Sequence, residues 1–273
     1  MSALAPGLPP ELKALMRRLK LGQVLDTLPE RLALARQHGL GHLEFLEQLL
    51  SDEVQRRDAT SAAVRARAAH LDPSMVLEAW DESADVSYDR AVWAELVSLR
   101  FVEKAQNALI LGPVGTGKTF MATALGHIAC RRRIGVHFER ADRLVKRLKA
   151  ARLDASHEAE VRKLVGVELL VLDDFCLQAL DATETADIYE VVIERHRRSS
   201  TVVTSDRDPS EWLAMMADPL LAQSAVDRLK NAAWELVIEG SSYRARQKPT
   251  LGPAPPGQPP PAAPGRPKRR SRA

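Results

Sequence analysis

The chain has 273 residues, of which 45% are hydrophobic, so it can build one full core and a smaller accessory domain, which excludes a wholly disordered protein. Its net charge of +3 is unevenly distributed, because residues 249–273 contain five of the 39 basic residues and no acidic ones. The rest of the chain has 34 basic and 36 acidic residues and is therefore slightly acidic. A basic footprint over the whole surface is excluded, and any nucleic-acid contact must come from local clusters.

The chain is expected to belong to the reducing cytoplasm. Its two cysteines, Cys130 and Cys176, lie 46 residues apart and form no CxxC pair, which excludes a disulfide framework and a cysteine-rich zinc site. The first residues lack the apolar run of a secretory signal, and no stretch approaches the roughly 18 apolar residues of a membrane span. We therefore predict a cytoplasmic protein with no membrane partner.

The N-terminal part of the chain is predicted to be helical. Apolar residues recur at helical spacing over 11–20, roughly 21–38, about 42–70 and, beyond an interruption at Pro73, over 88–99. Strand signals are lacking there. We assign residues 1–72 to a small all-α domain and residues 73–106 to a linker and helix.

Short apolar runs alternate with helical segments from residue 107 onward. The runs cover 108–111, 134–138, 168–172, 201–204 and 234–238. This alternation indicates an α/β domain over 107–248, with a parallel sheet that is flanked by helices on both faces. Residues 249–273 hold nine prolines and the five cations, and we predict a disordered Pro-rich basic tail.

Residues 112–119 read GPVGTGKT, the Walker A pattern, and lie between an apolar strand and a predicted helix. Glycines let backbone N–H groups approach the phosphates of ATP, and a helix N-terminus favours negative charge. Lys118 is predicted to reach the β and γ phosphates, and the Thr119 hydroxyl to ligate Mg²⁺. The alternative is a chance glycine-rich turn. The residues predicted to contact ATP are Gly112, Pro113, Val114, Gly115, Thr116, Gly117, Lys118, Thr119 and Phe120.

Paired carboxylates follow the apolar run ELLVL, which is the Walker B arrangement. Asp173 is predicted to hold Mg²⁺ through water, while Asp174 polarises the attacking water as general base. Two acids after a strand can instead cap the next turn. Because they follow a P-loop here, the catalytic interpretation is favoured.

Three further polar or basic side chains are candidates for contact with the γ-phosphate. The strand TVVTSD ends at Asp206 and can point a polar tip at this group, although an ordinary turn after the strand is the alternative. Arg228 and Arg244 could each stabilise the charge that develops in phosphoryl transfer, or be solvated surface arginines.

A dense basic cluster follows the second strand of the α/β domain. Leu144, Val145 and Leu148 predict an amphipathic helix whose other faces are cationic and suited to DNA phosphates. A solvated helix face is the alternative, and the RHRR patch at 195–198 is a second candidate. The residues predicted to bind DNA are Arg143, Lys146, Arg147, Lys149 and Arg152.

The order of these motifs, GPVGTGKT, LLVLDDF, TVVTSD with PSEW, DRL and GSSYR, resembles the IstB-like branch of the AAA+ ATPases. These are helper proteins of bacterial insertion-sequence transposition and are similar to DnaC-type helicase loaders. The resemblance covers roughly residues 10–248, including the FLEQLLSDE stretch in the N-terminal helices. It implies an AAA+ P-loop NTPase fold, ATP hydrolysis, assembly into a homo-oligomer on double-stranded DNA, and the transposase of the same insertion sequence as partner.

The resemblance also implies roles that the residues alone leave open. Residues 204–206 would form the sensor I segment, Arg228 the arginine finger across a subunit interface, and Arg244 the sensor II arginine in cis. The N-terminal helices would serve assembly or partner binding. The sequence departs from the family pattern in three places: Asp206 replaces the usual asparagine, which predicts slower hydrolysis, Cys176 replaces a glycine after Phe175, and residues 120–122 (FMA) replace a His-Leu-Ala-like stretch after the P-loop.

Two other functions compete with the transposition helper. A DnaC-like replicative helicase loader would use the N-terminal helices to hold a helicase and would prefer single-stranded DNA. A nucleotide-dependent scaffold that does not hydrolyse ATP is suggested by the carboxylate of Asp206.

Overall fold

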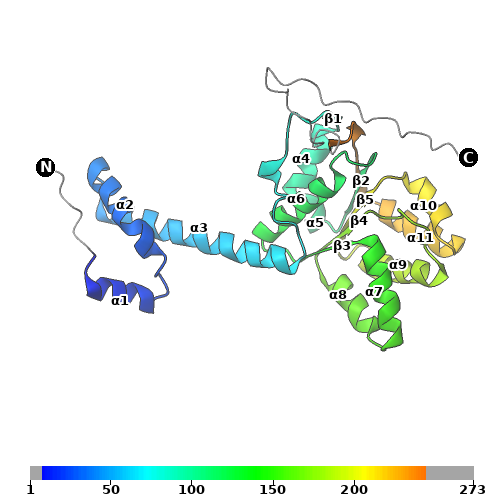
Figure 1. Ribbon diagram of the computed structural model, residues 1–273, viewed down its shortest axis with the longest axis horizontal. Coiled ribbons are helices and arrows are strands. Elements are labelled where there is room, and N and C mark those ends of the chain that lie inside the picture. The colour runs from blue at the N-terminus through cyan, green and yellow to red at the C-terminus, as the bar shows by residue number, and fades with distance from the viewer. Residues whose placement is uncertain (1–7, 244–273) are drawn as a thin grey trace, which may run out of the picture.

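The computed structural model describes residues 8–243, which form a small helical lobe and a larger α/β body joined by one long helix (Figure 1). The lobe consists of α1 (Pro10–Arg18), α2 (Val24–His38) and the first turns of α3 (His42–Ala68). Its core is small and is formed by Met16, Val24, Leu28 and Leu49. The predicted Pro-rich tail lies outside the described residues.

Helix α3 runs from the lobe to the body as a single element of 27 residues, which corresponds to roughly 40 Å at 1.5 Å per residue. At its far end it packs on α6, where Ala66, Ala69 and Leu71 bury Cys130. Arg65 fixes this junction, because its Nε donates to the Cys130 carbonyl at 2.9 Å. No helix within residues 8–243 is both long and apolar enough to cross a membrane.

The body is built on a five-stranded sheet in the order β3-β4-β5-β2-β6, and every neighbouring pair is parallel. The strands are β2 (Asn107–Leu111), β3 (Val136–Arg140), β4 (Leu169–Asp173), β5 (Ser200–Ser205) and β6 (Ala233–Val237). Every residue of β2, β4 and β5 is buried, as expected for strands that are covered on both faces. The predicted parallel α/β sheet is confirmed.

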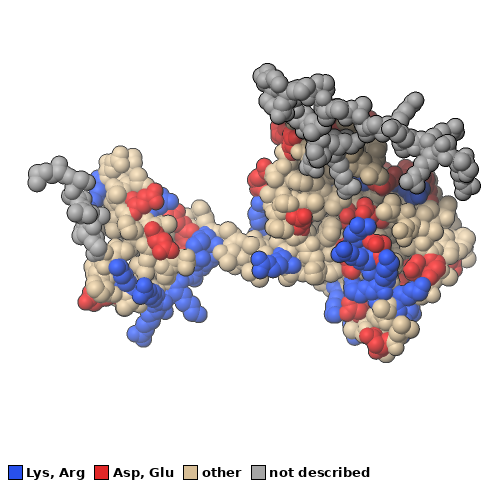
Figure 2. All heavy atoms as spheres, viewed as in Figure 1, with Lys and Arg blue, Asp and Glu red and all other residues tan. Residues whose placement is uncertain are grey.

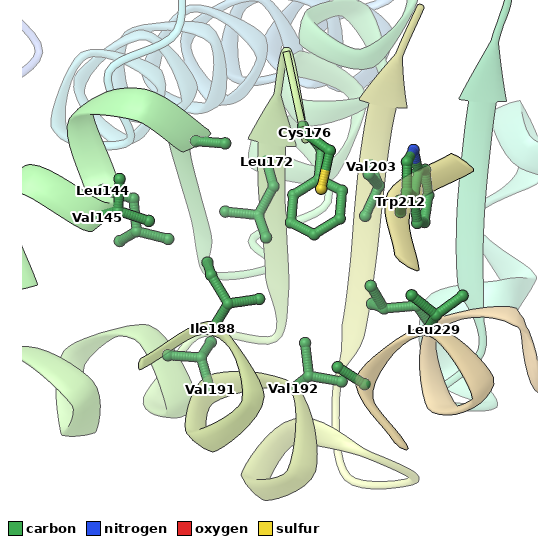
Figure 3. Packing of buried hydrophobic residues seen from close by; sticks show 14 of the residues in the cluster. Leu144, Val145, Leu172, Cys176, Ile188, Val191, Val192, Val203, Trp212 and Leu229 are labelled. Carbon is green, nitrogen blue, oxygen red and sulfur yellow. The ribbon is translucent and has the colours of Figure 1, made fainter. Parts of the chain in front are cut away.

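Helices cover both faces of the sheet, and successive side chains along a strand point alternately to one face and the other. The even residues Ala108 and Ile110 of β2 pack with the helices on one face, and Leu109 and Leu111 pack with those on the other. The first face carries α4 (Arg90–Ser98), α5 (Arg100–Glu103) and α6 (Lys118–Arg131). The second carries α7 (Ala141–Leu153), α8 (His157–Gly166), α9 (Ala182–Arg195), α10 (Pro209–Met215) and α11 (Pro219–Lys230), whose packing is shown in Figure 3.

Two segments outside the main sheet are joined by a short antiparallel pair. The segment that follows α3 contains the 3₁₀ turn η1 (Leu77–Ala79) and β1 (Val86–Ser87), and β1 pairs with β7 (Glu239–Gly240). This pairing ties the chain before the sheet to the chain after it. Because both segments lie at the edge where the parallel strands end, they can enclose a site there.

Candidate functional site

The GPVGTGKT segment forms the connection between β2 and α6. Gly117 directly precedes α6 in a left-handed conformation, with φ of 97°, and Gly115 has φ of 85°. The Thr116 hydroxyl closes the loop by donating to the Pro113 carbonyl at 2.9 Å. The loop therefore ends at the N-terminus of a 14-residue helix, which is a favourable place for a phosphate.

Lys118 is buried, with 5% of its side chain exposed, and lies across this loop. Its Nζ donates to the carbonyls of Gly112 and Pro113, both at 2.7 Å. The same Nζ lies 2.5 Å from Oδ1 of Asp206, at the end of β5. Asp206, the departure noted in the sequence, is thus the counter-ion of the P-loop lysine.

The predicted Mg²⁺ ligands lie together at the end of β4. The Thr204 hydroxyl donates to Oδ1 of Asp173 at 2.6 Å, and the nearby Thr119 hydroxyl also favours the ionised form of this carboxylate. Burial raises the pKa of Asp173, and the hydrogen bond from Thr204 opposes that effect. A buried carboxylate beside a hydroxyl offers the oxygen donors that Mg²⁺ prefers, so these residues fit the ion.

The turn that follows contains two residues in the left-handed region, Asp174 with φ of 55° and Cys176 with φ of 53°. Between them, Phe175 is buried against Trp212, with ring centroids 4.9 Å apart. Residue 176 therefore has the backbone conformation that favours the glycine of the family pattern. Burial raises the pKa of the Cys176 thiol to about 12, so this cysteine is inert at neutral pH.

A cavity of about 550 Å³ opens beside the P-loop and has an aromatic wall. Trp80 lies against Phe120, with ring centroids 5.3 Å apart, and its ring occupies the space next to the Cα of Gly117. A side chain at Gly117 would place its Cβ 2.8 Å from that ring. Tyr243 closes another side, because its N–H donates to the Gly115 carbonyl at 2.9 Å. Asp174 and Asp206 also line the cavity.

Trp80 and Tyr243 are site residues that the motif analysis missed. Trp80 lies in an irregular segment with no periodic pattern, and the packing of η1 on α6 together with the pairing of β1 with β7 holds this segment beside the P-loop. Tyr243 belongs to the GSSYR motif, where the sequence drew attention to the following arginine instead. Both residues are recognisable only once the segments on either side of the sheet are placed.

Of the two candidate arginines, only Arg228 lies among the described residues. Arg228 is on α11, where its guanidinium donates to the Ser224 carbonyl at 3.0 Å, and it is not among the residues that line the cavity. Arg244 lies outside the described residues, directly after Tyr243. Neither role implied by the family resemblance is tested by this arrangement.

The basic helix α7 carries much less free charge than its sequence predicts. Acids from elsewhere in the chain pair with three of its five candidate residues: Arg147 pairs with Glu139 and Glu160, Lys149 with Asp181, and Arg152 with Asp187. Lys146 lies 3.7 Å from Asp142, and only Arg143 has no ion pair within residues 8–243.

Burial raises the pKa of Glu139, but hydrogen bonds from His137 and Arg147 outweigh it and lower the pKa to about 2, so this carboxylate stays ionised. In the second candidate patch, 195–198, Arg195 is 2% exposed and belongs to the core, whereas Arg197 and Arg198 are exposed.

Comparisons with known proteins agree with these features. Residues 14–250 match the family model described as IstB-like ATP binding protein. The chain is 35% identical over 241 residues to an ATP-binding protein of an insertion sequence from Mycobacterium tuberculosis, covering 88% of this chain and 96% of that protein. It is 31% identical over 242 residues to an insertion-sequence ATP-binding protein of Pseudomonas aeruginosa, covering 89% and 91%.

Solved structures share the fold at lower identity. The crystal structure of DnaI superposes with a TM-score of 0.53 and 20% identity, covering 60% of this chain and 90% of that one. A DNA replication initiation factor superposes with a TM-score of 0.51 and 22% identity, and the match covers 62% of this chain but only half of that protein. Both likenesses concern the AAA+ fold alone.

Proposed function

The chain belongs to the IstB-like ATP-binding protein family, and from this premise we propose that it is an ATPase that assembles on double-stranded DNA and helps to recruit and stimulate the transposase of its insertion sequence. The observation that carries the proposal is that Lys118, Asp174 and Asp206 line one aromatic-walled cavity. The ends of three strands and the N-terminus of a helix form this site. It offers backbone N–H groups, a lysine and carboxylates, which are the groups that bind the phosphates and the metal ion of a nucleoside triphosphate.

The proposed chemistry divides among the residues of this edge. Lys118 and the loop N–H groups hold the phosphates, while Thr119 and Asp173 hold Mg²⁺, which neutralises phosphate charge when it is bound with ATP. Asp174 lines the cavity and orients the attacking water as general base. We assign Arg228 to the neighbouring subunit's site, because in its own subunit it does not line the cavity, and Arg244 to the same subunit's nucleotide.

The aromatic wall of the cavity fits the adenine base. Trp80 and Phe120 offer flat apolar surface in the wall of a cavity that Lys118 and Asp206 also line. A base stacked on an aromatic side chain gains about 1–3 kcal/mol. The aromatic wall would therefore contribute affinity that does not depend on the phosphates.

We expect Trp80→Ala to weaken ATP binding by about 5- to 30-fold, because stacking worth about 1–2 kcal/mol is lost. Trp80→Phe, which keeps an aromatic ring over Gly117, should retain most of the affinity. Isothermal titration with ATP and with inorganic triphosphate separates the effects, since only ATP binding should respond to the alanine variant. An equal loss for triphosphate would show that Trp80 shapes the P-loop and does not hold the base.

Self-assembly is supported by the surface of the N-terminal lobe. Large apolar side chains are exposed there at helical spacing along α3, with Leu43 82%, Leu46 48%, Leu50 45% and Val54 58% exposed. A row of exposed apolar side chains along one side of a helix is typical of a surface that another subunit covers. We propose that it contributes to the homo-oligomer.

Binding to labelled duplex and single-stranded DNA of equal length tests the function, with ATP, with ADP and without nucleotide, while particle mass and phosphate release are followed. We expect large assemblies that require ATP, favour the duplex and release phosphate. Preference for single strands would support the DnaC-like helicase loader instead. Tight ATP binding and assembly without phosphate release would support the non-hydrolysing scaffold.

A further inference from the structure

One face of the N-terminal lobe concentrates positive charge from two helices. Lys13 and Arg17 lie one turn apart on α1, Lys20 follows the helix, and Arg56 and Arg57 are on α3. The Nη2 of Arg57 donates to the Lys20 carbonyl at 2.6 Å, which brings the two sets together. Figure 2 shows basic side chains gathered along the lower side of this lobe. We call these five residues the lobe cation face.

The charge of the lobe cation face is largely uncompensated. Within residues 8–243, Lys13, Arg17 and Lys20 take part in no ion pair, and Arg56 and Arg57 share one carboxylate, that of Glu53. Five cations thus face one acid. On α7, by contrast, four of the five cations have an acid within 4 Å, and Figure 2 shows both charges interspersed over the body.

The arginines of this face are held in place and still have free donors. Glu53 is 4% exposed, and hydrogen bonds from Arg56 and Arg57, of which that from Arg56 is the strongest, lower its pKa to about 2. It therefore stays ionised and fixes both guanidinium groups. The two side chains remain 42% and 49% exposed, and Nη1 of each makes no hydrogen bond within the described part of the chain. Fixed, solvent-facing N–H donors suit phosphate oxygens.

We propose that the lobe cation face binds the phosphate backbone of duplex DNA, an inference that rests on the proposed DNA-dependent function and assigns the contact to the N-terminal lobe in place of α7. Cations that the protein itself does not neutralise contribute most to the binding free energy, because each can replace a counterion that is released from the DNA phosphates. The paired cations of α7 would first have to give up their acids.

An anionic membrane is the rival partner, because α1 also exposes Leu15 at 57% and Leu19 at 67%. A membrane-bound helix places its apolar side chains at the centre of the contact, with cations at the rim. Leu15 is two residues from both Lys13 and Arg17, which corresponds to about 200° around the helix, so it points away from the cation face. The geometry favours a polyanion that is contacted by the cations alone.

The test compares two matched double variants of the full chain, Arg17→Gln/Lys20→Gln in the lobe and Arg143→Gln/Lys146→Gln on α7. Both remove two exposed cations. Duplex binding is measured with ATP over a range of salt concentrations. We expect the lobe variant to bind at least 10-fold more weakly near 100 mM salt and to lose roughly two units of the slope of log K against log salt, whereas the α7 variant changes less than 3-fold.

The outcomes separate this inference from the proposed function. If the wild-type chain binds duplex and the lobe variant binds equally well, the lobe assignment is overturned while the function stands. If the wild-type chain does not bind DNA under any nucleotide condition, both fail. Loss of binding to phosphatidylglycerol vesicles without loss of DNA binding in the lobe variant would identify a membrane surface and overturn the inference. Titration with ATP verifies that the α/β body of each variant is folded and still binds nucleotide.

Discussion

Replacing Lys118 with alanine is expected to weaken ATP binding by at least 100-fold and to abolish nucleotide-dependent assembly. The ammonium group lies between the loop carbonyls of Gly112 and Pro113 and the carboxylate of Asp206. Without it, the phosphates lose their nearest cation and meet an unpaired carboxylate in the same place. A 100-fold loss corresponds to about 2.7 kcal/mol, which is reasonable for one buried charge-assisted contact plus the repulsion it had prevented.

The matched variant Asp206→Asn separates these two contributions. It removes the carboxylate that competes with phosphate for Lys118 and restores the residue type usual in the family, so ATP should bind several-fold more tightly than to the wild-type protein. The double variant Lys118→Ala/Asp206→Asn should recover part of the loss seen in Lys118→Ala. Titration calorimetry with ATP on the wild type, the two single variants and the double variant gives the coupling free energy between Lys118 and Asp206 in ATP binding. Additive effects would show that the ion pair does not oppose nucleotide binding.

The sequence predicted the nucleotide-binding edge well because its determinants are local. A strand of buried apolar residues, a glycine-rich turn and a helix start follow one another within residues 107–131, and each has its own pattern. Asp173 and Asp206 follow two further buried strands. Since parallel strands end at one edge, the side chains that follow these strands are expected near the P-loop, and Nζ of Lys118 lies 2.5 Å from Oδ1 of Asp206.

What the sequence did not predict depends on contacts between distant segments. The acids that neutralise α7 are up to 35 residues away along the chain, as in the pair of Arg152 and Asp187, so the local excess of basic residues overstated the surface charge. In the same way, Trp80 reaches the P-loop through the packing of η1 on α6 and the pairing of β1 with β7, both of which join segments that are distant in the sequence. Counts of charge in a sequence window describe the surface only where no acid approaches from another element.

Arg195 is the clearest case of a residue whose sequence context misleads. In RHRR it suggests a surface patch, yet its guanidinium is buried and donates to three backbone carbonyls, two at the end of α8 and one at the start of β5. Its Nη1 donates to the carbonyls of Leu164 at 2.6 Å and Val167 at 2.8 Å, and its Nη2 donates to that of Ser200. Burial lowers the pKa of Arg195 to about 10, so it remains charged at neutral pH. It thereby joins α8, α9 and β5.

We expect Arg195→Met to lower the free energy of unfolding by about 3 kcal/mol. Methionine fills similar space but leaves three buried carbonyls without a donor, at about 1–3 kcal/mol each, and relief from burying a charge offsets part of that cost. Arg198→Met is the matched control. Arg198 is 71% exposed and, within residues 8–243, forms an ion pair only with the exposed Glu194, so its loss should change stability by less than about 0.5 kcal/mol.

Urea denaturation followed by tryptophan fluorescence measures both variants, because Trp212 is buried in the core that α9 helps to form (Figure 3). A large loss in the Arg195 variant alone would establish that these hydrogen bonds outweigh the desolvation of the guanidinium. Equal free energies of unfolding for the two variants would mean that an apolar side chain at position 195 stabilises this junction as much as the arginine does. In that case the cation would have been retained for something other than the stability of the fold.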